Sequence, residues 1–157
     1  ASIAKSLGMT IHYHNRSKLS KDKEDGATFH KDLKGLLNVS DVLSVCCPAT
    51  KETTNLINKE TLEYLPPGAV VTNVARGDIV NDEALIEALN SRKVYAVGLD
   101  VYKGEPNLNP GYLKHKSAFI LPHLGSASKH TRTAMANLAI DNIDEFFRTG
   151  SSKNKVN

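Results

Sequence analysis

The sequence predicts an α/β fold, a doubly wound parallel sheet of the Rossmann type that is truncated at its N-terminus. Segments with a strand-like apolar pattern alternate along the chain with segments of helical spacing. This alternation is typical of parallel strands, because each parallel connection must cross over and a helix is the usual crossover. Residues 69–75 are apolar almost throughout, as expected of a strand that is covered on both faces.

The chain opens inside a helical pattern. Apolar residues have helical spacing from Ile3 to Leu7, no capping residue precedes them, and Gly8 ends the helix. Residues 9–14 then alternate between apolar and polar side chains like a strand. Because the first helix lacks a start signal, we expect further residues upstream of Ala1.

The rest of the chain continues this alternation after a Lys- and Asp-rich loop over residues 18–26. Pro48 stops a buried strand, since proline cannot donate a ladder hydrogen bond. Asn81 is placed to cap a helix. The patterns predict helices over 32–37, 58–64, 84–92 and 129–148, and strands over 42–47, 69–75, 95–102 and 117–122.

Composition excludes several classes of protein. The chain has 157 residues, of which 40% are hydrophobic and 24% charged, as in a globular domain. The formal net charge is +3 and the basic residues are scattered, so we expect no nucleic-acid partner. No apolar run approaches the roughly 20 residues of a membrane span, and the N-terminus lacks the pattern of a signal peptide. We therefore expect a cytoplasmic protein with no membrane partner.

Cys46 and Cys47 are the only cysteines of the chain. Adjacent residues rarely have the geometry of a mutual disulfide, and no second pair exists to complete a metal site. The sequence therefore predicts two buried free thiols and no metal.

Polar residues stand at or just after the ends of the predicted strands. They are Arg16, Arg76, Asp100, Glu105 and His123. In open α/β sheets, ligands bind beyond the carboxyl ends of the strands. We therefore expect all five on one edge of the sheet, around a common site.

The segments 73–80, 98–106 and 121–126 resemble the C-terminal motifs of the D-isomer-specific 2-hydroxyacid dehydrogenases, and the resemblance spans essentially the whole chain. It includes the order and spacing of Arg76, Glu105 and His123. Among family members, the sequence is most similar to glyoxylate and hydroxypyruvate reductases.

The resemblance implies a catalytic set of Arg76, Glu105 and His123, and elementary chemistry agrees. A guanidinium can hold the carboxylate and the carbonyl of a 2-oxo acid, and an imidazole can donate a proton near neutral pH. A carboxylate beside that imidazole would fix its tautomer. Taken singly, the three residues could be a surface charge, a turn and a structural histidine. Their joint spacing favours the catalytic interpretation.

Asn15 stands where this fold normally carries an Asp or Glu that binds the adenine ribose and repels a 2′-phosphate. Arg16 and Ser17 follow it, so the sequence predicts a preference for NADP(H), with NAD(H) possible. A solvated turn with an incidental arginine is the alternative.

The resemblance extends the cofactor site along the strand ends. Asp100 would lie near the nicotinamide amide, although it could also be a cap or turn residue. Cys47 and Pro48 would lie along the adenosine portion, although a proline-terminated core strand explains them equally well. The full set of expected cofactor contacts is Asn15, Arg16, Ser17, Cys47, Pro48, Val74, Ala75, Arg76, Asp100, His123 and Gly125.

The resemblance also implies a domain organisation. Residues 1–127 would form a partial dinucleotide-binding domain, and residues 128–157 a C-terminal helix and tail that return toward a substrate domain. The family's G-x-G-x-x-G phosphate loop would lie just before Ala1. We expect exposed apolar surface where the other half would pack, and a homodimer in the full-length protein.

These observations lead to one main hypothesis. The chain is expected to belong to an NAD(P)-dependent oxidoreductase that transfers a hydride between NAD(P)H and a small 2-oxo acid or D-2-hydroxy acid, such as glyoxylate or hydroxypyruvate. The alternatives are a non-catalytic nucleotide-sensing or partner-binding module and an inactive fragment of the dehydrogenase. Phosphoglycerate and lactate-type substrates stay open, because the missing domain would contact the variable end of the substrate.

Overall fold

The structure is a computed structural model that describes residues 1–156. The chain divides into two compact units, and the boundary between them along the sequence lies between Pro122 and His123. The domain boundary expected after residue 127 stays a prediction.

The first unit begins with a two-stranded parallel sheet. The strands of this sheet are β1 (His12–Tyr13) and β2 (Thr28–Phe29). The helix α1 (Ser2–Ser6) precedes β1, and the helix α2 (Lys21–Glu24) lies between the two strands in sequence. The helix α2 and the strand β2 were not predicted, since each is too short to show a periodic pattern of apolar residues. Gly8 has a φ of +83°, the left-handed conformation expected of a helix stop. Within the described residues, this sheet is separate from the main four-stranded sheet. Arg16 therefore follows a strand of a different sheet from Arg76, Asp100, Glu105 and His123, and the expectation that all five lie on one edge of one sheet is wrong.

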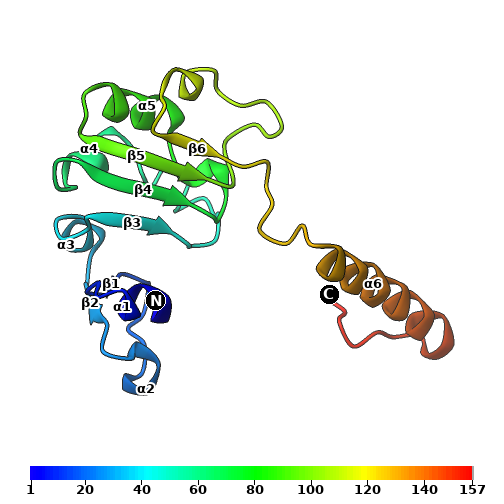
Figure 1. Cartoon of the computed structure of the whole chain (residues 1–157). Helices are drawn as coiled ribbons and strands as arrows, with labels where there is room; N and C mark the ends of the chain where they lie inside the picture. Colours follow the sequence, from blue (N-terminus) through cyan, green and yellow to red (C-terminus); the bar gives the residue numbers. More distant parts are fainter. Residues whose placement is uncertain (157) are drawn as a thin grey trace. The chain divides into compact units, whose positions relative to one another are not determined.

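The main sheet has four parallel strands in the order β3-β4-β5-β6. Figure 1 shows the strands side by side and pointing the same way. Its elements are α3 (Leu33–Leu37), β3 (Val42–Val45), α4 (Lys59–Glu63), β4 (Ala69–Asn73), the 3-10 helix η1 (Gly77–Ile79), α5 (Asp82–Asn90), β5 (Val94–Leu99), the 3-10 helix η2 (Tyr112–Lys114) and β6 (Ala118–Ile120). The Rossmann-like class expected from the sequence is confirmed.

Side-chain caps start three of these helices. Asp32 Oδ1 accepts the backbone N–H of Gly35 at 2.7 Å, and Asn81 Oδ1 accepts that of Ala84 at 2.9 Å. Asn58 and Thr61 form a reciprocal capping box. Each cap satisfies backbone donors that the first turn of a helix leaves without a partner.

One face of the main sheet carries the core. Leu43, Val71 and Val97 are register neighbours on this face and are 5%, 0% and 2% exposed. Leu85 of α5 is fully buried in the same cluster, together with Leu62 of α4. The crossover helices α4 and α5 therefore cover the same side of the sheet.

The opposite face is not covered to the same extent. Ser44, Thr72, Gly98 and Phe119 are register neighbours on it, and Phe119 is 66% exposed. Val70 of β4 is only half-buried. The expectation that residues 69–75 are covered on both faces is therefore wrong, because both crossover helices of this sheet pack on one side.

The cysteines differ from their prediction in one respect. Both are free, as expected, but Cys46 is exposed and Cys47 is half-buried. Strand β3 ends at Val45, so these two residues lie beyond the ladder rather than in the core. Burial raises the pKa of the Cys47 thiol.

The second unit contains α6 (Lys129–Thr149), capped by Ser128 and ended by Gly150 in a left-handed conformation. None of the residues of α6 is buried. Apolar side chains at helical spacing are exposed along it, which agrees with the expectation of exposed apolar surface. They are Met135, Leu138, Ile140, Ile143, Phe146 and Phe147. Among the described residues, no helix is both long and apolar enough to cross a membrane.

The covered face should dominate the stability of the first unit. Replacing Leu85→Ala should lower the free energy of unfolding by about 2–5 kcal/mol, because it removes apolar contacts and leaves a cavity. The control Leu113→Ala, at a side chain that is 73% exposed, should change it by less than about 0.5 kcal/mol. Urea unfolding followed by circular dichroism measures both. Equal losses in the two variants would contradict this assignment of the core.

Candidate functional site

The carboxyl ends of the main strands lie level with one another. Val45, Asn73, Leu99 and Ile120 are register neighbours and are the last residues of their strands. Hydrogen bonds continue past the ends: the N–H of Asp100 donates to the Asn73 carbonyl at 3.0 Å. Residues that follow these strands therefore share one edge, where ligands bind in open α/β sheets.

A buried asparagine shapes the turn that carries Arg76. The side chain of Asn73 is 1% exposed, and its amide Nδ2 donates to the Arg76 carbonyl at 2.9 Å. Its Oδ1 accepts the N–H of Ala75 at 3.0 Å. Two hydrogen bonds from one buried side chain thus fix the turn after β4, which leaves the Arg76 side chain exposed at the edge.

Gly77 brings this turn against the loop that follows β5. A Cβ at Gly77 would lie 2.1 Å from the carbonyl carbon of Tyr102 and 2.4 Å from the nitrogen of Lys103. Both atoms belong to backbone, so no side-chain rotation could relieve the clash. Only glycine permits this approach.

The same loop carries Glu105. Its Oε1 accepts the N–H of Tyr102 at 3.1 Å, and the Glu105-Pro106 peptide is cis. The Tyr102–Lys103 peptide, which contacts Gly77, is therefore adjacent to the Tyr102 N–H, which binds the Glu105 carboxylate. Arg76 and Glu105, 29 residues apart in sequence, are brought to one edge of one unit.

Sequence reasoning missed Asn73 and Gly77 as organisers of the site, although both stand inside a motif that it singled out. The signal was present: a polar residue ends an apolar strand, and a glycine follows the candidate arginine. Their partners lie in other segments, so the pattern alone did not identify the contacts.

His123 opens the second unit and has a φ of +55°. Gly125 follows it in the same unit. The convergence of His123 with Arg76 and Glu105, and its role as proton donor, stay predictions. So do the cofactor contacts expected of Val74, Ala75, Asp100 and Gly125.

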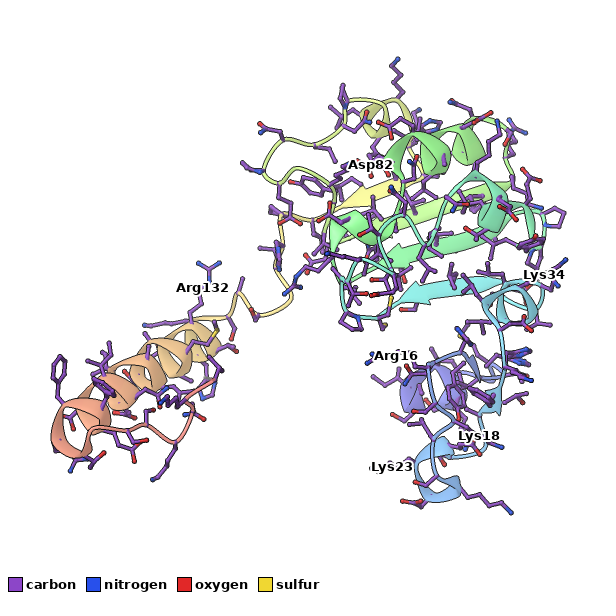
Figure 2. All side chains as sticks on the ribbon, turned by 180° about the vertical axis from the view of Figure 1, so that it is seen from behind. Arg16, Lys18, Lys23, Lys34, Asp82 and Arg132 are labelled. Atoms are coloured by element: carbon purple, nitrogen blue, oxygen red, sulfur yellow. The ribbon has the colours of Figure 1, made fainter. Side chains whose placement is uncertain are left out.

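The loop after β1 carries the residues expected to bind the adenosine end of a cofactor. Asn15 Oδ1 accepts the N–H of Arg16 at 2.9 Å, and Asn15, Arg16 and Ser17 are exposed. Figure 2 shows Arg16 and Lys18 projecting from this segment. Tyr13 stabilises this loop, because its hydroxyl donates a hydrogen bond to Glu24 at 2.5 Å and accepts one from the N–H of Leu19 at 3.0 Å.

Arg16 lies within electrostatic reach of the loop that follows β3. A hydrogen bond from Thr50 lowers the pKa of the Glu52 carboxyl, and the positive charge of Arg16 lowers it further. Cys47 and Pro48 stand at the start of this loop, and Pro48 is exposed. Within residues 1–156, no group of three or more His, Cys, Asp or Glu side chains could hold a metal ion.

Comparison with known proteins gives a consistent result. Residues 1–125 match the model of the family described as D-isomer specific 2-hydroxyacid dehydrogenase, NAD binding domain. The glycerate dehydrogenase of Hyphomicrobium methylovorum is 42% identical over 149 residues, which cover 94% of this chain. The glyoxylate reductase of Thermococcus litoralis is 36% identical over the whole chain.

Solved structures agree. The NADPH-dependent glyoxylate/hydroxypyruvate reductase of Sinorhizobium meliloti, in complex with NADP and malonate, is 36% identical and superposes with a TM-score of 0.89. The match covers 97% of this chain and 47% of that one. The chain spans 46% and 47% of the two curated relatives named above, or about half their length.

The contact at Gly77 can be tested directly. Gly77→Ala should lower the free energy of unfolding by about 1–3 kcal/mol or more, because the added methyl forces two backbone segments apart. Gly98→Ala is the matched control, since its methyl would meet only the Thr72 methyl at 3.4 Å. Urea unfolding of both variants measures the difference. A Gly77→Ala variant as stable as Gly98→Ala would contradict the close approach.

Proposed function

Because this chain belongs to the D-isomer specific 2-hydroxyacid dehydrogenase family, we propose that it supplies the nucleotide-binding side of an enzyme that interconverts small 2-oxo acids and D-2-hydroxy acids. Relatives named glycerate dehydrogenase and glyoxylate reductase support this substrate class. The observation that carries the proposal is the approach of Gly77 to Tyr102, which brings Arg76 and Glu105 to one sheet edge. A nucleotide-sensing module would not need this pairing.

Arg76 is the substrate anchor in this proposal. A guanidinium presents parallel N–H donors that match a carboxylate, and it can also reach the adjacent carbonyl oxygen. The two hydrogen bonds of the Asn73 side chain hold the backbone of the turn at Arg76, so the Arg76 side chain extends from a fixed backbone position. Such a fixed starting point limits the cost of orienting a bound 2-oxo acid.

His123 and Glu105 divide the proton chemistry. When a carbonyl is reduced, negative charge develops on its oxygen, and a protonated imidazole can donate a proton there. A carboxylate beside the imidazole favours its protonated form and fixes which nitrogen faces the substrate. In the reverse direction, His123 would accept the proton of the hydroxyl group.

A nicotinamide cofactor fits the residues at this edge. Val74 is an exposed apolar residue (58%) directly after β4, where a flat ring could pack, and Asp100 follows β5. Arg16 and Pro48 are exposed after β1 and β3, where the adenosine end would lie. When bound, the cofactor supplies or accepts the hydride.

We also propose a preference for NADP(H) over NAD(H). The neutral amide of Asn15, the guanidinium of Arg16 and the hydroxyl of Ser17 can all donate hydrogen bonds to a 2′-phosphate. No carboxylate stands in this turn to repel the phosphate. The similar reductase of Sinorhizobium meliloti is described as NADPH-dependent.

Activity is proposed for a polypeptide of the relatives' length, because the chain spans about half of them. The remaining half would supply a phosphate-binding loop and a substrate domain. The exposed apolar side chains of α6 are available to pack against that domain. The homodimer and the cytoplasmic location expected from the sequence stay predictions.

The cofactor preference predicts the effect of Arg16→Asp. The isolated chain should lose affinity for adenosine 2′,5′-bisphosphate by about tenfold or more, because a cation that binds phosphate becomes a repelling carboxylate. Affinity for adenosine 5′-monophosphate should change little. Lys116→Asp, which makes the same charge change just before β6 of the main sheet, is the control. Calorimetric titration gives the affinities, and an unchanged ratio of the two in Arg16→Asp would refute the preference.

The proton-donor role predicts the effect of His123→Ala in the complete polypeptide. Loss of the general acid should lower kcat for glyoxylate by a factor of about 10²–10⁴. His130→Ala, at an exposed histidine of α6, should retain turnover. Steady-state kinetics with NADPH measures both. Near-normal turnover in His123→Ala would refute the assignment.

A further inference from the structure

A buried hydrogen bond joins α5 to the loop that precedes β6. The hydroxyl of Tyr112 donates to Asp82 Oδ1 at 2.8 Å, and the two residues are 1% and 5% exposed. Figure 2 shows Asp82 at the start of α5. The two residues are 30 positions apart in the sequence, so the bond fixes two segments that are distant along the chain.

Each partner depends on the other. Burial raises the pKa of the Asp82 carboxyl, and the Tyr112 hydrogen bond lowers it again in part. Burial and the negative charge of Asp82 raise the pKa of the Tyr112 hydroxyl, which therefore stays protonated and remains a donor. Removing the hydroxyl would leave a buried carboxylate without this partner, and such a loss is costly.

The loop held by this bond is the one that carries Glu105. Upstream of Glu105, the Tyr102 peptide packs on Gly77. Downstream, Tyr112 binds Asp82, and a Cβ at the neighbouring Gly111 would lie 2.7 Å from Ile86 Cδ1. The loop is thus held at Tyr102, before Glu105, and at Gly111 and Tyr112, after it.

Both anchors come from one short segment. Gly77 and Asp82 follow Arg76 by one and six residues. The segment that begins with the candidate substrate anchor therefore also holds the loop that carries the candidate carboxylate.

We propose that Asp82 and Tyr112 are positioning residues, whose hydrogen bond holds the Glu105 loop in register with Arg76. Neither residue is assigned contact with substrate or cofactor. The consequence for catalysis rests on the proposed function, whereas the effect on the loop does not.

Hydrogen exchange at one amide reports on the loop. The Tyr102 N–H binds the Glu105 carboxylate, so its exchange rate measures how often that contact opens. In Tyr112→Phe this rate should rise about tenfold. The Val70 amide, which donates to the Asp41 carbonyl in the main sheet, should change much less and serves as the reference. Tyr95→Phe removes the hydroxyl of an exposed tyrosine and is the control variant.

Two substitutions at Asp82 separate positioning from general destabilisation. Asp82→Asn keeps an oxygen that can accept from Tyr112, so Tyr102 exchange should stay within about threefold of the wild-type rate. Asp82→Ala removes the acceptor and should match Tyr112→Phe. Unchanged Tyr102 exchange in Tyr112→Phe would overturn the proposal, as would equal acceleration at Tyr102 and Val70.

A turnover measurement on the complete polypeptide adds a separate readout. Tyr112→Phe should lower kcat for glyoxylate more than it raises KM, while Asp82→Asn should restore most of the rate. A normal kcat in Tyr112→Phe would overturn the catalytic part of the inference. Failure of the proposed function itself would instead appear as normal turnover in His123→Ala, with the exchange results intact.

Discussion

The close approach of Gly77 to the Tyr102 peptide is the constraint on which the candidate site depends. Two backbone segments meet there at a distance that leaves no room for a Cβ atom. One segment carries Arg76, and the other carries Glu105. Because backbone meets backbone, this contact fixes the relative position of the two backbone segments before any ligand binds, and a fixed backbone is one part of the preorganisation that catalysis requires.

Around this contact, hydrogen bonds of buried polar side chains fix the turns and loops that carry the candidate site residues. Asn73 satisfies two backbone groups of the Arg76 turn. Tyr112 and Asp82 hold the far side of the Glu105 loop. Buried polar groups of this kind specify one arrangement, since any other would leave them without partners. The shape of the edge therefore follows from a small number of hydrogen bonds between segments that are distant in sequence.

The sequence predicted the elements of the main sheet because its apolar pattern is strong. Residues 42–47 and 69–75 became β3 and β4, and Asn81 caps α5 as its position indicates. It did not predict β2, whose two residues are too few for a period, nor the uncovered sheet face, since a pattern shows that a residue is apolar but not what covers it. The pairing of Tyr112 with Asp82 depends on tertiary packing and leaves no local signal. The candidate catalytic residues Arg76, Glu105 and His123 came from the family resemblance and its spacing, and both their roles and their convergence stay predictions.

A crystal structure of the complete polypeptide with NADP and oxalate, a stable mimic of a 2-oxo acid, is the most direct test of the convergence of Arg76, Glu105 and His123. We expect the Arg76 guanidinium and the His123 imidazole both to contact the oxalate, with the Glu105 carboxylate within about 2.6–3.2 Å of a ring nitrogen of His123. Oxalate bound elsewhere, with His123 remote from Glu105, would contradict this convergence.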